Sequence, residues 1–258
     1  SVKDAMEKDP VNSLKSLKEM GYQDFESYGY DADRKKYYEF SPIEFKTILN
    51  DLGLTTSSGH YAINSLMESS DYKLFKYLDS CINASLTLGD KYIVYPMLNS
   101  KYHSYDGYKL LVKKLNQMGL EIEKSGLNFA YHNFGYDFNL YNGKMGLEWI
   151  IEETNPDWVK LQVDFYWVMR ANKIMPKDLI NLAQGRFKLW HIKDMDPITK
   201  DYTELGYGSI DYTMVLPEPK LSGLESYYLE QGGNYKLNSM DSARKSIDFF
   251  KKNIQKLI

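Results

Sequence analysis

The sequence lacks the features that mark several large classes of protein. Cys81 is the only cysteine, which excludes an intramolecular disulfide and a thiolate metal cluster. No glycine-rich fingerprint of the G-x-G-x-x-G type occurs, so nothing in the chain favours a dinucleotide-binding sheet. No apolar run approaches the roughly 18 residues that a membrane-spanning helix needs, and no signal peptide is recognisable. We expect no membrane partner, and the compartment stays open between the cytoplasm and, for a chain whose leader has been removed, the periplasm.

Net charge is also low, because 32 basic residues are offset by 35 acidic ones and the formal net charge is −3 at pH 7. A protein that grips the phosphate backbone of nucleic acid normally carries a clear excess of positive charge, so we expect no nucleic-acid partner. The 258 residues, 43% of them hydrophobic, suffice for one large core, and a single α/β barrel commonly has this size. We therefore expect one domain that spans residues 1–258.

Helix and strand patterns alternate along the whole chain. The helices have clear end signals, such as Asp9-Pro10 before and Gly21 after the first of them, and a capping box formed by Ser41 and Glu44 at the second. They span residues 10–20, 42–52, 71–88, 104–124, 145–153 and 176–183, and a last helix has Ala243, Ile247, Phe250 and Ile254 on one face. Short apolar strands lie near residues 23, 55, 92, 127, 159, 187 and 226. This alternation is typical of a parallel sheet with helical crossovers.

A (β/α)8 TIM barrel needs eight strands, and the chain shows seven. The segment Ser1–Asp4, ahead of the first helix, is typical of the exit of a strand whose body lies upstream. We therefore predict a TIM barrel whose first strand is missing or truncated at the N-terminus. A seven-stranded barrel with an open seam beside Glu26 is the expected result.

Three of the predicted strands end in polar side chains that are able to do chemistry. The strand from Val159 ends at Asp164, the strand around Phe187–Ile192 carries His191 and is followed by Lys193, and the last strand is followed by Glu230. Because the carboxyl ends of parallel strands in a barrel lie at the same face, this pattern indicates a site.

Six motifs, in order, carry a resemblance to a known family. They are Ser1–Asp4, Tyr131–Asn133 followed by Asp137-Phe138, Val163–Trp167, Gly185–Asp194, Gly206–Asp211 and Leu229–Gln231. Together they resemble the xylose-isomerase-like sugar phosphate isomerase/epimerase superfamily. The pattern looks closest to its branch near inosose dehydratase and the bacterial 3-keto-glycoside-processing enzymes. The resemblance covers essentially the whole chain, and it is specific for the superfamily rather than for one reaction.

The resemblance implies one divalent metal ion at the carboxyl ends of the strands and a sugar or keto-sugar substrate. Matched motif by motif, it implies metal ligation by Asp164, His191 and Glu230, with His132 as the substitute for a fourth ligand. It implies catalytic roles for Lys193, Glu26 and His60. It implies substrate-binding roles for Trp167, Asp137, Tyr207 and Gln231.

The chain departs from the family pattern at two places. Many members carry a metal-binding glutamate two residues before the position of His132, and this chain has Ala130 there. The related pattern Tyr-His-Asn-His-x-x-Glu-Phe is altered as well, with Phe134 in place of the second histidine and Asp137 in place of the glutamate. These departures put the fourth ligand in question and indicate an altered pocket.

Such a site suits the removal of a weakly acidic proton from the carbon next to a carbonyl. A divalent cation that bridges two oxygens stabilises the resulting enolate as a Lewis acid. Carboxylate and imidazole ligands suit Mn, Co, Mg or Zn, and they do not choose among these metals. Lys193 or a carboxylate then serves as acid or base.

Several functions fit this chemistry. One is a metal-dependent sugar isomerase or epimerase that works through an enediolate, and another is a lyase or dehydratase on keto-sugars or 3-keto-glycosides, because both begin with the same proton abstraction. A third is a carbohydrate-binding protein that has lost its metal, which Ala130 favours. An abasic-site endonuclease of the same superfamily fold would need more zinc ligands and a basic face. Purely structural alternatives also exist: His191 is then a buried strand histidine without a catalytic role, and Lys193 and Asp194 form a salt bridge.

The stretch from Asp196 to Gly223 is too long for an ordinary connection in this fold. Long loops at the site face of a barrel are usually functional. We predict that it folds over the mouth of the pocket beside Lys193, with Tyr202 or Tyr207 contributing to the lid.

Overall fold

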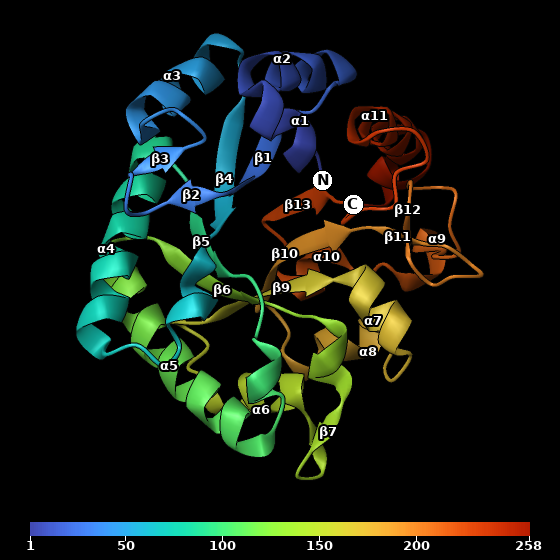
Figure 1. Ribbon diagram of the computed structural model, residues 1–258. Helices are drawn as coiled ribbons and strands as arrows, with labels where there is room; N and C mark the ends of the chain where they lie inside the picture. Colours follow the sequence, from blue (N-terminus) through green and yellow to red (C-terminus); the bar gives the residue numbers. More distant parts are fainter. The chain divides into compact units, whose positions relative to one another are not determined.

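Seven strands form the main sheet in a computed structural model that describes all residues, 1–258 (Figure 1). Their order is β1-β4-β5-β6-β9-β10-β13, which follows the chain order, and helices alternate with them. The seven strands predicted from the sequence are therefore confirmed. The chain divides into two compact units; unit 1 comprises Ser1–Asp24, Ile48–Leu54 and Val163–Ile258, and unit 2 comprises Phe25–Thr47 and Thr55–Gln162.

Unit 2 contains five strands of the main sheet. They are β1 (Asp24–Tyr28) from Phe25 onward, β4 (Thr55–His60), β5 (Tyr92–Tyr95), β6 (Asn128–His132) and the first part of β9 (Lys160–Asp164). All four residues of β5 are buried, as expected for a strand in a sheet that is covered on each side. The pairs β4–β5, β5–β6 and β6–β9 are parallel, and the last of them sets His132 opposite Gln162.

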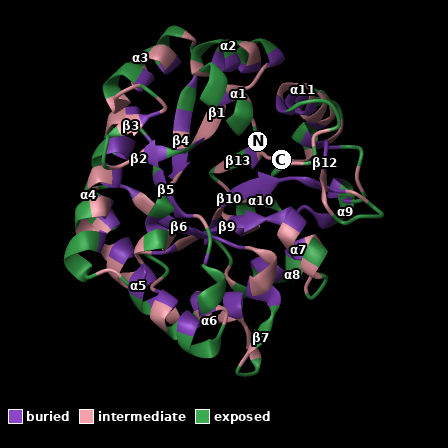
Figure 2. Ribbon diagram, viewed as in Figure 1, coloured by how far each residue is buried: buried purple, intermediate pink, exposed green.

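Two long helices pack on the strands of unit 2. Helix α4 (Asp71–Leu88) contacts β4 and β5, and α5 (Tyr105–Lys124) contacts β6, as Figure 1 shows. Each helix buries one stripe, which for α5 includes Leu111, Leu115 and Met118. Figure 2 shows the result as alternating buried and exposed bands on α4 and α5.

Unit 1 contains the end of β9 together with β10 (Phe187–Ile192) and β13 (Ser226–Leu229). Strands β10 and β13 are parallel, with His191 opposite Tyr228. Helices α2 (Pro10–Met20) and α11 (Ser239–Phe249) contact each other in this unit. The Tyr22 hydroxyl donates a hydrogen bond of 3.0 Å to the carbonyl of Ala243 in α11.

The helix ends follow the local signals in the sequence. Helix α2 begins at Pro10 with the side chain of Asp9 accepting from Asn12 N, and Gly21 ends it in the left-handed conformation at φ 101°. Helix α3 (Pro42–Asp51) begins with the predicted capping box, in which Ser41 N donates to Glu44 Oε2 at 2.7 Å. The remaining helices and strands are α6 (Gly146–Glu153), α8 (Pro176–Leu182), β2 (Tyr30–Asp31), β3 (Lys36–Tyr37), β7 (Leu140–Tyr141), β8 (Lys144–Met145), the short 3-10 helices Ala62–Leu66, Ser100–Tyr102, Gly135–Phe138 and Gln255–Leu257, and a π-helix at Phe250–Ile254.

Short elements differ from the sequence-based expectation. Helix α1 (Lys3–Lys8) occupies residues that were expected to end a strand, and α7 (Phe165–Ala171) begins directly after β9 without having been predicted. The stretch 196–223 is not irregular throughout, because β11 (Asp194–Met195) pairs with β12 (Tyr202–Thr203), and α9 (Tyr212–Val215) and α10 (Pro219–Ser222) follow. Helices of one or two turns repeat too few apolar positions to be recognised by period. None of the helices combines the length and the hydropathy that crossing a bilayer requires.

Candidate metal and proton-transfer site

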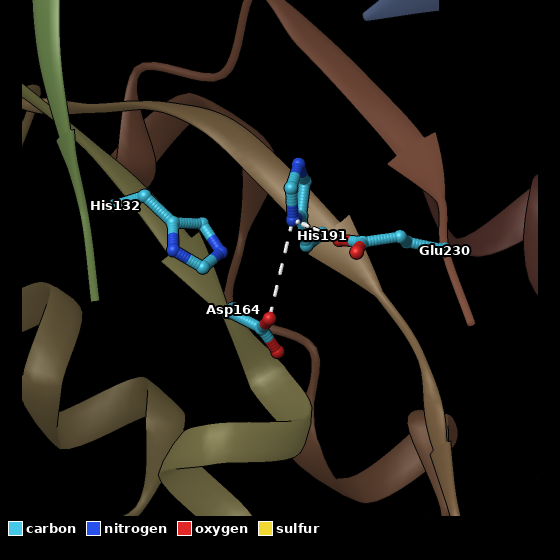
Figure 3. A group of neighbouring side chains, drawn as sticks. All are labelled: His132, Asp164, His191 and Glu230. Carbon is cyan, nitrogen blue, oxygen red and sulfur yellow. Dashed lines mark ion pairs between the residues drawn. The ribbon is translucent and has the colours of Figure 1, made fainter. Parts of the chain in front are cut away.

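Three potential metal ligands of unit 1 lie together. Asp164 is the last residue of β9, His191 lies near the end of β10, and Glu230 directly follows β13. Their ligand atoms lie within 4.8 Å of one another. His191 Nδ1 is 2.6 Å from Glu230 Oε2 and 3.9 Å from Asp164 Oδ2, which Figure 3 shows as dashed lines. The structure therefore brings together the three residues that the strand-end pattern singled out.

A lysine ammonium lies between the two carboxylates of this group. Lys193 Nζ is 2.7 Å from Asp164 Oδ2 and 2.8 Å from Glu230 Oε2. Burial alone would lower the pKa of Lys193, but the charges of Asp164 and Glu230 outweigh it and raise the pKa. Burial would likewise raise the pKa of Glu230, but Lys193 and His191 hold that pKa well below its usual range. Glu230 therefore stays a carboxylate and Lys193 an ammonium near neutral pH.

The donor set fits a divalent cation. Two carboxylates and one imidazole are ligands shared by Mg, Mn and Zn sites, and all three side chains converge from rigid strand ends. The position of the Lys193 ammonium shows that Asp164 and Glu230 direct oxygen atoms at a common point of positive charge. Metal binding itself stays a prediction.

His132, the predicted fourth ligand, is the last residue of β6 in unit 2. Its Nδ1 is 3.1 Å from the carbonyl oxygen of Pro96, and its ring lies edge-on to those of His60 and Phe134. Figure 3 draws it with the three residues of unit 1. A role for His132 as ligand stays a prediction.

Unit 2 contains a second polar cluster, around Glu26. His60 Nε2 lies 3.0 Å from Glu26 Oε2 and 2.8 Å from Gln162 Oε1. Glu26 Oε1 accepts from Gln162 Nε2 at 2.8 Å and from the hydroxyl of Ser58. The predicted pair Glu26 and His60 is thus in direct contact. Sequence reasoning missed Gln162, whose signal is a polar residue between the apolar Leu161 and Val163, at the second position before Asp164.

Trp167 and Gln231 were predicted to bind substrate, and only Trp167 has contacts that lead towards Lys193. The half-buried ring of Trp167 lies edge-on to Tyr202, whose ring centroid is 5.7 Å from Lys193 Nζ. Gln231 is buried, and its side-chain nitrogen donates to the carbonyl oxygens of Gly233 and Asn234, so it shapes the turn after β13.

The other two predicted substrate-binding residues lie in different surroundings. Tyr207 is 53% exposed and lies 4.4 Å from the ammonium of Lys236, whereas Tyr202 is the tyrosine of this loop that lies beside Lys193. Asp137 is fully buried, and it accepts from the Tyr108 and Tyr131 hydroxyls and from Phe134 N. These contacts give Asp137 a structural role, and substrate binding by either residue stays a prediction without a supporting contact.

Asp194 and Tyr212 hold the loop that follows β10. The Asp194 carboxylate accepts from the backbone nitrogens of Gly206, Gly208 and Ile210 at 2.9–3.1 Å. The Tyr212 hydroxyl accepts from Lys193 N and donates to Lys193 O. The loop is therefore anchored beside Lys193, and its role as a lid over the pocket stays a prediction. Asp194 does not form the salt bridge with Lys193 that was considered as a structural alternative, because Lys193 pairs with Asp164 and Glu230.

The chain is similar to known proteins in both sequence and fold. A family model described as "Xylose isomerase-like TIM barrel" matches residues 14–253. Comparison with curated proteins returned no match. A sugar phosphate isomerase/epimerase from Parabacteroides distasonis ATCC 8503 superposes with a TM-score of 0.85 at 25% identity, over 98% of this chain and 91% of that one.

Two further solved structures are similar in fold. A xylose isomerase-like TIM barrel protein from Mycobacterium smegmatis, in complex with magnesium, has a TM-score of 0.64 and 17% identity, over 98% of this chain and 90% of that one. The probable 3-DHS dehydratase AsbF from Bacillus anthracis has a TM-score of 0.70 and 13% identity, over 95% and 93%.

Proposed function

The chain belongs to the xylose isomerase-like TIM barrel family, and from that premise we propose that it is a divalent-metal-dependent isomerase or epimerase of small sugars or keto-sugars. The reaction begins with removal of the proton from a carbon next to a carbonyl. The observation that carries the proposal is the convergence of Asp164, His191 and Glu230 around one point of positive charge.

In this proposal Asp164, His191 and Glu230 hold the metal ion. A bound divalent cation supplies Lewis-acid stabilisation of the negative charge that develops on adjacent substrate oxygens. The Lys193 ammonium contacts the same two carboxylates that would hold the ion, so metal binding would displace it, and it would then donate a hydrogen bond to a substrate oxygen beside them. Its charge is secured by those carboxylates, so it stabilises an oxyanion at neutral pH.

Glu26 and His60 act as the proton-transfer pair. The Glu26 carboxylate is held in place by contacts with Ser58, Gln162 and His60, and as a carboxylate it would act as the base. Abstraction of the proton leaves an enediolate. Return of a proton to the neighbouring carbon completes an isomerisation, and return to the opposite face of the same carbon completes an epimerisation.

Two of the structural relatives support this choice of chemistry. The Parabacteroides distasonis relative is described as a sugar phosphate isomerase/epimerase, and the Mycobacterium smegmatis relative was solved with magnesium. The substrate proposed here is accordingly a small sugar, and the ion proposed is magnesium, manganese or another divalent metal.

The test combines metal content with exchange of substrate hydrogen in D2O. We expect the purified protein to retain about one divalent ion and to catalyse deuterium incorporation next to the carbonyl of at least one compound among free ketoses, sugar phosphates and 3-keto-glucosides. Replacing Asp164 with Ala should abolish both, because it removes a ligand that is fully buried. The matched control is Asp157→Ala, an exposed aspartate ahead of the same strand.

Full metal occupancy in Asp164→Ala would refute the ligand assignment. Deuterium exchange that persists in fully metal-depleted protein would refute the metal dependence. Analysis of the product by NMR separates isomerisation from elimination, and an unsaturated product would replace the isomerase proposal with a lyase.

A further inference from the structure

The buried amide of Gln162 bridges the two members of the proposed proton-transfer pair. Its Oε1 lies 2.8 Å from His60 Nε2, and its Nε2 lies 2.8 Å from Glu26 Oε1. His60 Nε2 is also 3.0 Å from Glu26 Oε2. The three side chains thus form a closed triangle in unit 2, drawn from β1, β4 and β9.

The chemistry of the three side chains determines where the protons lie. His60 Nε2 faces two oxygen atoms, one from a carboxylate and one from an amide, and neither carries a proton to donate when Glu26 is ionised. Nε2 must therefore be the protonated nitrogen of His60. If the amide were turned the other way, its NH2 group would face the His60 N–H and its oxygen would face the Glu26 carboxylate. Two donors and two acceptors would then face each other without a hydrogen bond, so the observed orientation is favoured.

Burial keeps this arrangement from being exchanged for contacts with water. Gln162 is 1% exposed, and the side chains of Glu26 and His60 are 10% and 14% exposed. Ser58, which donates the second hydrogen bond to Glu26 Oε1, is fully buried. A buried amide that lost either partner would leave a polar group unsatisfied, which is costly, so the triangle is held as a unit.

Gln162 also lies on the same strand as Asp164, two residues earlier. Side chains two residues apart on a strand project from the same face of the sheet. The strand that presents the metal-ligand candidate Asp164 therefore presents the amide that holds Glu26 and His60.

We propose that Gln162 is a positioning residue, which holds the His60 ring and the Glu26 carboxylate in the relative orientation that proton transfer needs. This inference rests on the proposed function, since it assigns the pair to the same reaction. Gln162 itself does not touch the reacting atoms, and it acts through Glu26 and His60.

Two variants separate the two contacts of the amide. Gln162→Leu removes both, whereas Gln162→Glu keeps an oxygen towards His60 and replaces the donor towards Glu26 with a carboxylate. The control is Thr56→Val, an isosteric change at a buried polar residue of β4. The tautomer is read in the full-length protein from long-range 15N–1H NMR correlations of labelled histidine, which is tractable because the chain has 4 histidines. His60→Asn assigns the His60 signals.

We expect His60 to show the Nε2–H pattern in all four proteins, because the Glu26 carboxylate still accepts from Nε2. We expect the Nε2–H proton signal to shift in Gln162→Leu, where the second acceptor is lost, and to stay near its wild-type position in Thr56→Val and Gln162→Glu. Both Gln162 variants should lower kcat on the order of 10- to 100-fold with KM changed less than about twofold, since only the orientation of acid–base groups is lost. Metal content should stay at the wild-type level.

An Nε2–H proton signal of His60 that keeps its wild-type position in Gln162→Leu overturns the proposal, whatever the activity. A loss of kcat in Thr56→Val as large as that in Gln162→Leu also overturns the proposal, because any change of a buried polar side chain in these strands would then lower kcat. A wild type without bound metal and without deuterium exchange overturns the proposed function instead, and the NMR comparison still decides the role of Gln162 in fixing His60.

Discussion

Glu230 is a half-buried carboxylate and Asp137 a fully buried one, and their pKa values shift in opposite directions. Glu230 has the ammonium of Lys193 at 2.8 Å, and its pKa is lowered despite burial. Asp137 has only neutral donors, from Tyr108, Tyr131 and Phe134, and burial raises its pKa to about 7. A cation therefore decides which of the two stays ionised across the physiological range.

The raised pKa of Asp137 predicts a pH dependence of stability. Because the folded protein binds the Asp137 proton more tightly than the unfolded chain, stability from this residue is full below pH 3.8 and is lost as pH rises to about 7. Over that window the wild type should lose on the order of 4 kcal/mol relative to Asp137→Asn, which does not titrate. Urea unfolding at pH 5 and pH 8 measures about 3 kcal/mol of this difference, because the rest is already lost below pH 5. Parallel pH profiles for the two proteins would contradict it.

At the scale of an element, the loop after β10 depends on one side chain. Asp194 accepts four backbone N–H groups, those of Met195, Gly206, Gly208 and Ile210. A Cβ atom at Gly208 would lie 2.1 Å from Asp194 Oδ1, so the backbone approaches the carboxylate at a place where only glycine fits. The loop also presents Tyr202 to Lys193. A deletion of residues 199–204 would shorten the loop, but it would also remove Glu204. Glu204 is fully buried and accepts a hydrogen bond from Ser242, so the deletion would disturb the fold together with the lid.

A single substitution tests the loop more sharply. Asp194→Asn replaces one acceptor oxygen with an NH2 group that faces backbone donors, which costs on the order of 1 to 3 kcal/mol locally. We expect faster hydrogen exchange at Gly206–Ile210 and a severalfold rise in KM, with metal content unchanged. Asp201→Asn is the control, since that exposed carboxylate makes only a 3.8 Å surface pair with Arg170. Equal hydrogen exchange in the wild type and Asp194→Asn would refute the anchoring role.

At the scale of the whole molecule, the chain passes from one compact unit to the other between Gln162 and Val163, within β9. The residues on either side of that point belong to the two polar clusters, Gln162 to that of Glu26 and Asp164 to that of His191. Strand β9 therefore contributes residues to both units, among them Gln162 and Asp164. We expect metal binding at Asp164 to raise the free energy of unfolding.

Metal binding should therefore stabilise the folded protein as a whole. At a free metal concentration of 100 times Kd the gain is about 2.7 kcal/mol, which corresponds to a rise in Tm of roughly 5 to 10 °C for a chain of this size. Lys193→Met should lower Tm without metal, because Asp164 and Glu230 lose their buried cation, and should increase the metal-induced rise. Differential scanning calorimetry with and without Mn2+ measures both. A metal-induced rise retained in Asp164→Ala would contradict the ligand set.

The sequence by itself determined the strand count, the ends of the long helices and the polar character of the strand ends. These features depend on neighbouring residues: the capping box needs only Ser41 and Glu44, and the stop of α2 needs only Gly21. Asp164, His191 and Glu230 were recognisable for the same reason, since each ends or follows a short apolar strand.

Only the tertiary structure decided which side chains meet. Gln162 and Glu26 are separated by 136 positions and form a 2.8 Å hydrogen bond, because the order and register of the strands bring them together. The same is true of Lys193 between two carboxylates and of the burial of Asp137 beneath two tyrosines. Side-chain pairing across a sheet depends on the packing of distant segments, and that packing leaves no local pattern in the sequence.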